Sequence, residues 1–152
     1  MRCCKVALLV GALALTGTFP KIAAAELLIS EAEGKLPQSA ETGMATRGIT
    51  RGPGVEQVSP ASGSHDIKSP VPLKIKFIGR NNVPIDPATV KLTYLKTPAV
   101  DLTERVKAHV TKDGIDMPQA EMPPGTHFIR LDVKDAEGRS TSTTISLVVA
   151  PK

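Results

Sequence analysis

The sequence predicts an all-β sandwich of six to seven short strands, preceded by a signal peptide and a flexible arm. Three observations support this prediction. Apolar and polar residues alternate in four separate runs, turn-forming residues separate those runs, and a basic and then apolar segment begins the chain. We expect the 152 residues to hold one folded domain, because the sequence contains no internal repeat and no sign of a second core.

Residues 1–25 have the features of a cleavable secretory signal peptide. Two cations stand among the first five residues, residues 6–15 are all apolar or glycine, and residues 23–25 are alanines. A membrane anchor is the alternative, but spanning a bilayer takes about 20 apolar residues, and Pro20 and Lys21 interrupt the run. We therefore expect cleavage after residue 25 and a periplasmic or secreted protein with no membrane span.

Cleavage would leave a mature chain of 127 residues without cysteine, because Cys3 and Cys4 both lie in the peptide. They precede the apolar run, whereas a lipid-modified cysteine would follow it, so we predict no lipoprotein. Small exported domains often depend on disulfides, but this one must depend on packing. Three cations also leave with the peptide, and the formal charge falls from +4 to +1. That charge gives no electrostatic case for binding nucleic acid.

Residues 26–53 are predicted to form a mostly flexible N-terminal arm. A brief apolar patch at residues 27–29 precedes Ser30, which can cap one helical turn, and Gly34 and Pro37 then end that turn. The rest of the arm is rich in Ser, Thr, Gly, Arg and Pro, and it buries too little apolar surface to offset its ordering entropy. If residues 27–29 dock on a sheet edge or on a partner, the protein would assemble by strand or helix addition.

Alternation with a period of two begins after the arm and predicts half-buried strands in a domain over residues 54–152. Four runs supply the inward-facing residues: Val71, Leu73, Ile75 and Phe77; Val90, Leu92 and Tyr94; Ile129, Leu131 and Val133; Ile145, Leu147 and Val149. We expect a further short strand around Val55–Val58 and another at Ile115 and Met117.

Turn residues and one ambiguous segment complete the predicted domain. Asp135–Gly138 is the predicted hairpin turn before the last strand, since glycine supplies the positive φ that such turns need. Residues 101–110 fit either one helical turn or a strand. The helical turn is favoured, because Asp101 can cap it and Glu104 stands at the capping-box position.

Three motifs lie at the turns and edges of the predicted strands: Ser59-Pro60, the segment Ile85–Val90, and a closing stretch from Gly125 to Arg139. These motifs resemble those of the bacterial immunoglobulin-like domain, as found in uncharacterised exported proteobacterial proteins. The motifs specify turns and strand edges, so they bear on fold more than on activity. Members of that family serve as spacers, adhesive modules or accessory subunits. The resemblance therefore implies a non-catalytic exported binding or structural module, with another envelope protein or a surface component as its partner.

The sequence predicts no enzyme, and we assign no catalytic or cofactor-binding residue. There is no G-x-S-x-G elbow. Residues 62–66, Ser-Gly-Ser-His-Asp, bring hydroxyl, imidazole and carboxylate together in the sequence. Triad members, however, come from separate elements that converge in space, and we expect a polar turn there. His127 has the parity of the inward residues and is expected to be a satisfied strand-end histidine, whereas His109 is expected on the surface.

A periplasmic copper carrier is the alternative function, because that family has a similar sandwich with Ser-Pro after its first strand. Its members use a histidine at the mature N-terminus and an Asp-x-His pair, but Glu26 and Gly138-Arg139 stand at those places here. Calcium at Asp132, Asp135 and Glu137 would suit a hard cation. Asp132 nevertheless points away from Asp135 on an alternating strand, and Glu137 is in a hairpin tip. We therefore assign no metal ligand.

Aromatic residues and surface cations complete the sequence predictions. Phe77 and Tyr94 have inward parity, which leaves Phe128 as the single outward aromatic of the mature chain and too little for a sugar site. Five cations have outward parity and are predicted to form a solvated face that also guards strand edges: Lys74, Lys76, Lys91, Lys134 and Arg130.

Overall fold

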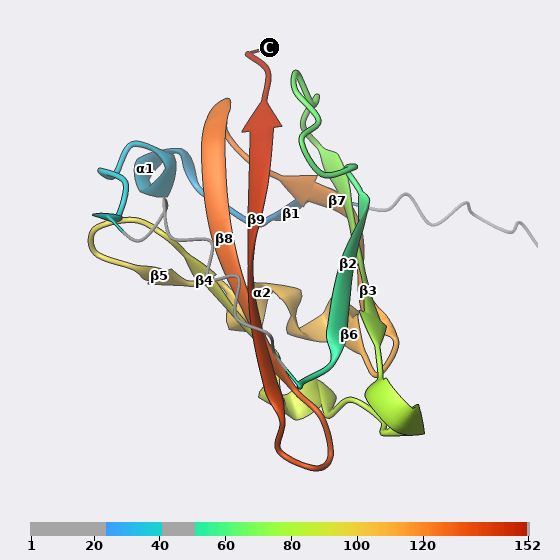
Figure 1. Ribbon diagram of the computed structural model, residues 1–152. Coiled ribbons are helices and arrows are strands. Elements are labelled where there is room, and N and C mark those ends of the chain that lie inside the picture. Colours follow the sequence, from blue (N-terminus) through green and yellow to red (C-terminus); the bar gives the residue numbers. More distant parts are fainter. Residues whose placement is uncertain (1–23, 41–50, 152) are drawn as a thin grey trace, which may run out of the picture.

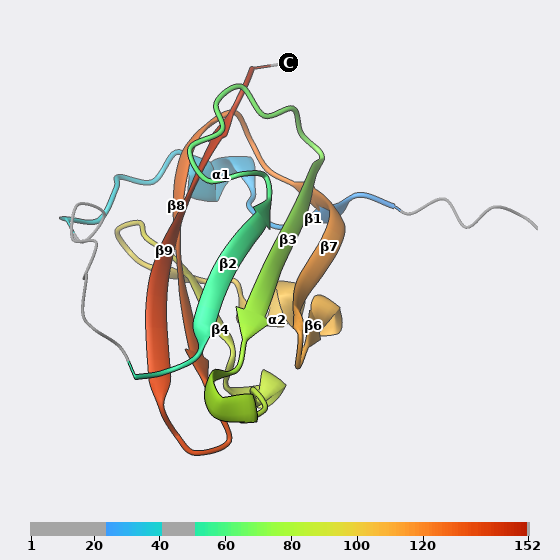
Figure 2. The same cartoon turned by 45° about the vertical axis from the view of Figure 1, so that its right-hand side comes forward.

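Two β-sheets face each other across a shared apolar core in the computed structural model (Figures 1 and 2). The structure describes residues 24–40 and 51–151. Nearly all of the predicted signal peptide therefore lies outside the described residues. Strands dominate the described part and helices are few and short, so the all-β sandwich predicted from the sequence is confirmed.

One sheet has five strands. Their order across the sheet is β1 (Glu26–Leu27), β7 (Gly114–Glu121), β3 (Val71–Ile78) and β2 (Gly54–Ser59), and β6 (Val110–Thr111) pairs with the first half of β7. The central strand β3 is antiparallel to both β2 and β7, whereas the short β1 runs parallel to β7. A β-bulge interrupts the register of β2 between Gln57 and Ser59. The bulge disturbs the pairing of this edge strand, as is common at sheet edges.

The second sheet has four strands, in the order β5 (Val100–Asp101), β4 (Lys91–Tyr94), β8 (Gly125–Lys134) and β9 (Ser140–Val149). The hairpin of β8 and β9 stays in register over all ten residues of each strand. Its turn is the one predicted at residues 135–138. There the Asp135 carboxylate accepts the backbone N–H groups of Glu137 and Arg139, and Gly138 has a φ of 81°.

Helical elements are confined to short connections. They are α1 (Glu31–Gly34), α2 (Thr103–Val106) and the 3-10 turns η2 (Arg80–Asn82), η3 (Pro87–Thr89) and η4 (Lys107–His109). All helices within residues 24–40 and 51–151 fall short of the length and apolar content that crossing a membrane requires. The sequence of residues 101–110 fitted either a helical turn or a strand, and the helical turn was favoured. The structure confirms it, since α2 and η4 occupy residues 103–109. Asp101 accepts the N–H of Thr103, but the predicted capping box with Glu104 is wrong, because the N-cap of α2 is Leu102 and its side chain makes no capping hydrogen bond.

The inward-facing residues of all four predicted runs are buried, which confirms the alternating register. Strand β3 alternates strictly between buried and exposed side chains along its whole length. Leu92, Tyr94, Leu131 and Leu147 have no exposed surface. Packing between the two sheets is therefore the main source of stability for the part of the chain that the structure describes.

Residues 26–40, which composition assigned to a flexible arm, lie against the sandwich in the structure (Figure 1). We call them the N-terminal strap. Leu28 and Ile29 have no exposed surface, and both backbone N–H groups donate to the carbonyl of Glu121. Ser30 caps α1, as predicted, in a capping box with Glu33. Docking of residues 27–29 on a sheet edge was one possibility from the sequence, but the sequence did not identify β7 of the same domain as that edge, because β7 lies far away in the chain. Residues 41–50 of the predicted arm lie outside the described residues.

Candidate functional site

A buried polar cluster lies where the N-terminal strap meets the end of β4. Lys96 is only 6% exposed, and its Nζ donates to the carbonyl oxygens of Gly34 and Leu36 at 3.1 and 2.9 Å. The same ammonium lies 5.3 Å from the centre of the Tyr94 ring. Two carbonyls and an aromatic face compensate the burial of this charge. Lys96 therefore binds the strap to the four-stranded sheet.

Tyr94 and His127 form the inner part of this cluster. The Tyr94 hydroxyl lies 2.7 Å from Nδ1 of His127, and Nε2 of His127 lies 2.8 Å from the carbonyl oxygen of Pro123. A neutral imidazole with its proton on Nε2 satisfies both contacts, since Nδ1 then accepts from the hydroxyl. Burial lowers the pKa of His127 and raises that of Tyr94 to about 12. The structure confirms the prediction that His127 lies near a strand end with a hydrogen-bond partner for each ring nitrogen.

Arg105 and Glu33 make the second attachment of the strap. Two guanidinium nitrogens of Arg105 donate to the two carboxylate oxygens of Glu33 at 2.8 and 2.7 Å, and one of them also donates to the carbonyl of Leu28. Chiefly through this hydrogen bonding, Arg105 holds the pKa of Glu33 at about 2. Such a bidentate pair fixes geometry as well as supplying energy. Both polar attachments hold the strap in place.

The residues 62–66 that combine hydroxyl, imidazole and carboxylate lie in the turns between β2 and β3. His65 and Asp66 are exposed, and Asp66 has a φ of 59°. The hydroxyl of Ser62 donates to the side-chain oxygen of Gln57 at 3.4 Å. This arrangement is the polar turn expected from the sequence.

The groups considered for metals hold partners of their own. Asp132 lies 3.4 Å from Arg130, and Asp135 binds Arg139 at 2.7 Å. Burial raises the pKa of Asp135, but the hydrogen bonds from Arg139 more than offset it, and the net shift is downward. Nowhere in residues 24–40 or 51–151 do three His, Cys, Asp or Glu side chains gather closely enough to hold an ion.

The two places where copper carriers hold ligands are occupied differently here. Glu26, on β1, lies 2.5 Å from Nε2 of His109, which is half-buried rather than on the open surface. Arg139, in the β8–β9 turn, pairs with Asp135 and Glu137. The side chains at both places are therefore engaged in contacts within the fold.

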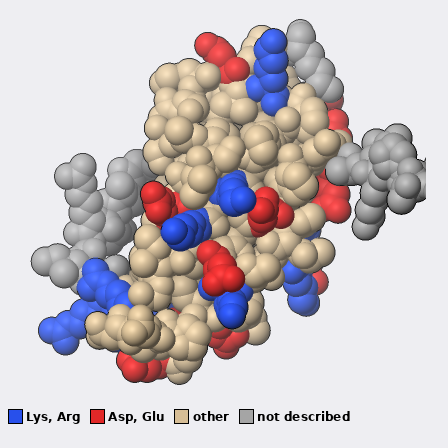
Figure 3. Space-filling model, turned by 90° about the vertical axis from the view of Figure 1, so that its right-hand side faces the viewer, with Lys and Arg blue, Asp and Glu red and all other residues tan. Residues whose placement is uncertain are grey.

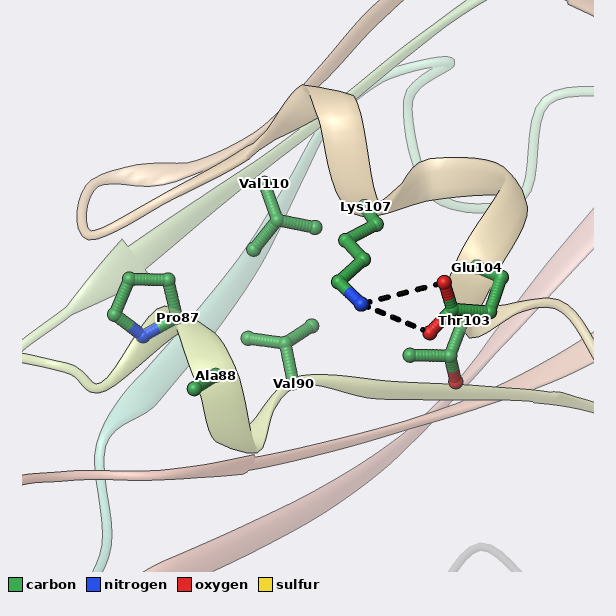
Figure 4. Close-up of a pocket in the computed structure, with 7 residues that line it drawn as sticks. All are labelled: Pro87, Ala88, Val90, Thr103, Glu104, Lys107 and Val110. Carbon is green, nitrogen blue, oxygen red and sulfur yellow. Dashed lines mark hydrogen bonds and ion pairs between the residues drawn. The ribbon is translucent and has the colours of Figure 1, made fainter.

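A small hollow lies between η3 and α2 (Figure 4). Aliphatic side chains form its walls, and Lys107 and Glu104 stand at its rim. Nζ of Lys107 donates to both carboxylate oxygens of Glu104, at 3.1 and 3.3 Å, and both side chains are mostly exposed. An exposed ion pair of this kind contributes little free energy. Its two charges neutralise each other at the rim of the hollow.

The outer face of the five-stranded sheet has the composition of an interaction surface. Three large hydrophobic side chains are about half exposed in the described residues. They are Leu27 on β1, Val58 on β2 and Ile78 on β3 of this sheet. Pro72 and Pro118 are also exposed, and the alternation of their strands places them on the outer side. Apolar residues gathered on one face often mark a contact with another molecule.

Charged residues on this face form cross-strand pairs. Lys74 on β3 binds Asp116 on β7 at 3.1 Å, and Lys76 stands opposite Glu56 on β2. Figure 3 shows acidic and basic side chains interleaved across the middle of the face, beside a broad area without them. We call the outer surface of β2, β3 and β7 the β2–β3–β7 face. Its charged and apolar residues are Glu56, Val58, Pro72, Lys74, Lys76, Ile78, Asp116 and Pro118.

A shallow hollow on this face lies beside Gly114, which stands opposite Lys76 in the register. Gly114 has a φ of 152°, and a Cβ atom there would overlap the carbonyl oxygen of Ile75. The strand therefore needs glycine at this position. The alternation in the sequence predicted that Ile78 shares the face of the outward lysines, and the structure confirms this, but the sequence did not indicate that Val58 and Asp116 lie there as well.

Comparisons of the chain with protein-family models, with curated proteins and with solved structures gave no match.

Proposed function

We propose that this chain is a non-catalytic, exported binding or structural module of the cell envelope, built as an immunoglobulin-like sandwich. The observation that carries the proposal is the β2–β3–β7 face, which combines exposed aliphatic side chains with paired charges on a rigid sheet. Such a surface suits contact with another macromolecule, whereas small-molecule sites are concave with a few convergent polar groups. Another envelope protein or a surface component is the proposed class of partner.

The engagement of the polar side chains also supports the proposal. His127, Lys96, Glu33 and Arg105 are bound to one another or to backbone carbonyls within the strap and its contacts. Catalytic groups usually face a cleft, where a substrate can reach them. Here Lys96, Glu33 and Arg105 hold the N-terminal strap, and His127 binds Tyr94 and the carbonyl of Pro123, which favours a structural role for these groups.

The envelope location rests on the predicted signal peptide, and a direct measurement tests it. Protein recovered from the periplasm and the medium is analysed by mass spectrometry, and the expected N-terminus is Glu26. A full-length species embedded in the membrane would contradict export. Cross-linking in intact cells, with the wild type compared with Val58→Asp, then tests whether the β2–β3–β7 face makes the contact. A cross-linking pattern unchanged by Val58→Asp would contradict that role.

A metal titration of the mature chain distinguishes the alternative, a copper carrier, from the proposed binding module. Dialysis against copper, zinc and calcium is expected to leave no stoichiometric ion bound. A one-to-one complex that raised the melting temperature would favour the alternative, because a ligand of the folded state stabilises that state.

A further inference from the structure

We infer that the partner of the β2–β3–β7 face is a second copy of this chain. The inference rests on the proposed function and specifies the partner. Three properties of the face lead to it: the arrangement of its charges, the position of its apolar residues and its size.

The charges on this face differ from strand to strand. The central strand β3 presents Lys74 and Lys76, the flanking strand β2 presents Glu56, and β7 presents Asp116. Two lysines on the central strand thus lie between a single carboxylate on either side. When a second copy is turned about a two-fold axis that runs parallel to the strands and is displaced by about one strand spacing of 4.8 Å, Lys76 of each copy stands over Glu56 of the other, because these two residues lie at the same level in the register. Self-complementarity of this kind is what a two-fold interface requires.

The same pattern disfavours other classes of partner. A nucleic acid or an anionic membrane surface needs a face with a clear excess of cations. The two lysines here are balanced by Glu56 and Asp116, and Lys74 already binds Asp116. The face therefore has little net charge but a fixed alternation, and electrostatic complementarity of this kind favours a specific partner more than it raises affinity.

The apolar residues lie where such a contact would bury them. Val58 is 47% exposed and borders the hollow that Lys74, Lys76 and Asp116 also line. Ile78 is 47% exposed at the end of β3. Pro72 and Pro118 have little conformational freedom to lose on association. Docking of a second copy would cover these side chains.

The size of the face predicts a weak dimer. A sheet surface three strands wide and eight residues long measures about 14 by 26 Å. Two copies would therefore bury no more than about 700 Å², which is below the usual range of stable interfaces. We expect dissociation constants in the micromolar range or weaker, and an affinity that falls as salt screens the charges.

Sedimentation equilibrium of the purified mature chain, residues 26–152, tests the inference. A reversible monomer–dimer equilibrium is expected between micromolar and millimolar concentration, and a wild type that stays monomeric throughout would overturn the inference. Because the purified chain is measured alone, a monomeric result removes the second copy as partner but leaves the export test and the cellular cross-linking test unaffected.

Charge-reversal variants identify the face. Lys74→Glu with Lys76→Glu makes it acidic, and Glu56→Lys with Asp116→Lys makes it basic. Each variant alone is expected to weaken self-association at least tenfold, whereas an equimolar mixture of the two should recover it as a heterodimer. The control matched to the double lysine variant is Lys91→Glu with Lys134→Glu. It changes the net charge by the same amount, but on the four-stranded sheet.

Folding of each variant is checked by its thermal unfolding curve. Val58→Ser is a second, milder variant that tests the face without altering its charge, and it is expected to weaken the dimer. A dimer that survives both charge-reversed variants unchanged would overturn the inference, as would a mixture that fails to associate although both variants are folded.

Discussion

Arg105 donates hydrogen bonds to both carboxylate oxygens of Glu33, 72 residues earlier in the sequence, at 2.8 and 2.7 Å. The same guanidinium binds the carbonyl of Leu28, which is itself wholly buried. One side chain of α2 thus holds both the apolar part of the N-terminal strap and its helix. This pair joins the strap to the domain and gives it a defined place in the fold.

Replacing Arg105 by methionine is expected to lower the free energy of unfolding by about 1–3 kcal/mol, because charge-assisted hydrogen bonds are lost while Glu33 stays partly buried. Urea titration followed by circular dichroism measures the change. Lys107→Met is the matched control, since its ion pair with Glu104 is solvated, and it should cost no more than about 0.5 kcal/mol. Equal effects of the two variants would show that the strap is not held by Arg105.

Acid should weaken the protein through Glu33. The folded-state pKa of this carboxyl is about 2, below its ordinary value of 4.5. Its contribution to stability is therefore fully present above pH 4.5 and is lost as the pH falls toward 2. We expect the stability of Glu33→Gln to lie below that of the wild type at pH 6 and to converge with it near pH 2. A stability difference between Glu33→Gln and the wild type that stayed constant with pH would contradict this expectation. Glu31→Gln, at an exposed position on the same helix, is the control.

Because of His127, we expect the stability of the fold to fall with acid in a second range, at higher pH than for Glu33. Burial, and to a lesser extent the charge of Lys96, holds the pKa of this imidazole below its ordinary value of 6.5, while its two nitrogens contact the Tyr94 hydroxyl and the Pro123 carbonyl. Because the unfolded chain binds the proton more readily, stability falls as the pH drops below about 6.5. NMR titration of the imidazole measures the pKa directly. A midpoint above 6.5 would contradict the burial of a neutral ring.

The alternating register predicts a contrast within β8. Leu131 has no exposed surface, so Leu131→Ala should cost about 2–5 kcal/mol of unfolding free energy. Lys134→Ala, at an exposed position of the same strand, should cost no more than about 0.5 kcal/mol. Denaturant midpoints of the two variants provide the measurement. Similar losses would show that the register of this strand, and with it the sandwich, is misassigned.

Gly114 offers a test of the backbone at the hollow. A methyl group on it would overlap the carbonyl oxygen of Ile75, which belongs to the neighbouring strand and cannot move freely. Gly114→Ala is therefore expected to cost several kcal/mol, about as much as a large core truncation. Gly63 also has a positive φ, of 80°, but its surroundings are open, so Gly63→Ala should cost only about 1 kcal/mol. A melting temperature for Gly114→Ala equal to that of Gly63→Ala would refute the close contact.

The strands and the hairpin were predictable because their signals are local. Residues such as Leu73 and Ile75 alternate with lysines within a single run, and the Asp135–Gly138 turn has its determinants inside the turn itself. Each signal needs only neighbouring residues, so one sequence suffices to predict the element.

The docking of the strap and the composition of the β2–β3–β7 face were not predictable in the same way. Leu28 is buried because residues from β7 and α2 meet it, and no property of residues 26–40 specifies those partners. The outward parity of Lys74 follows from the sequence, but its neighbour Asp116 is chosen by the order of strands in the sheet. Strand order depends on the packing of the whole core, which single-run patterns do not encode.

The pairing of β1 with β7 also governs when the molecule can finish folding. Glu26 is among the first described residues to be synthesised, yet its partner in the sheet, Ala120, comes 94 residues later. Contacts of such long sequence separation form slowly, because a large loop must close before they stabilise anything. A chain that crosses a membrane from its N-terminus as an unfolded thread would keep its first strand unpaired until almost all of it had emerged. The pairing of β1 with β7 would thus delay completion of the fold during the proposed export.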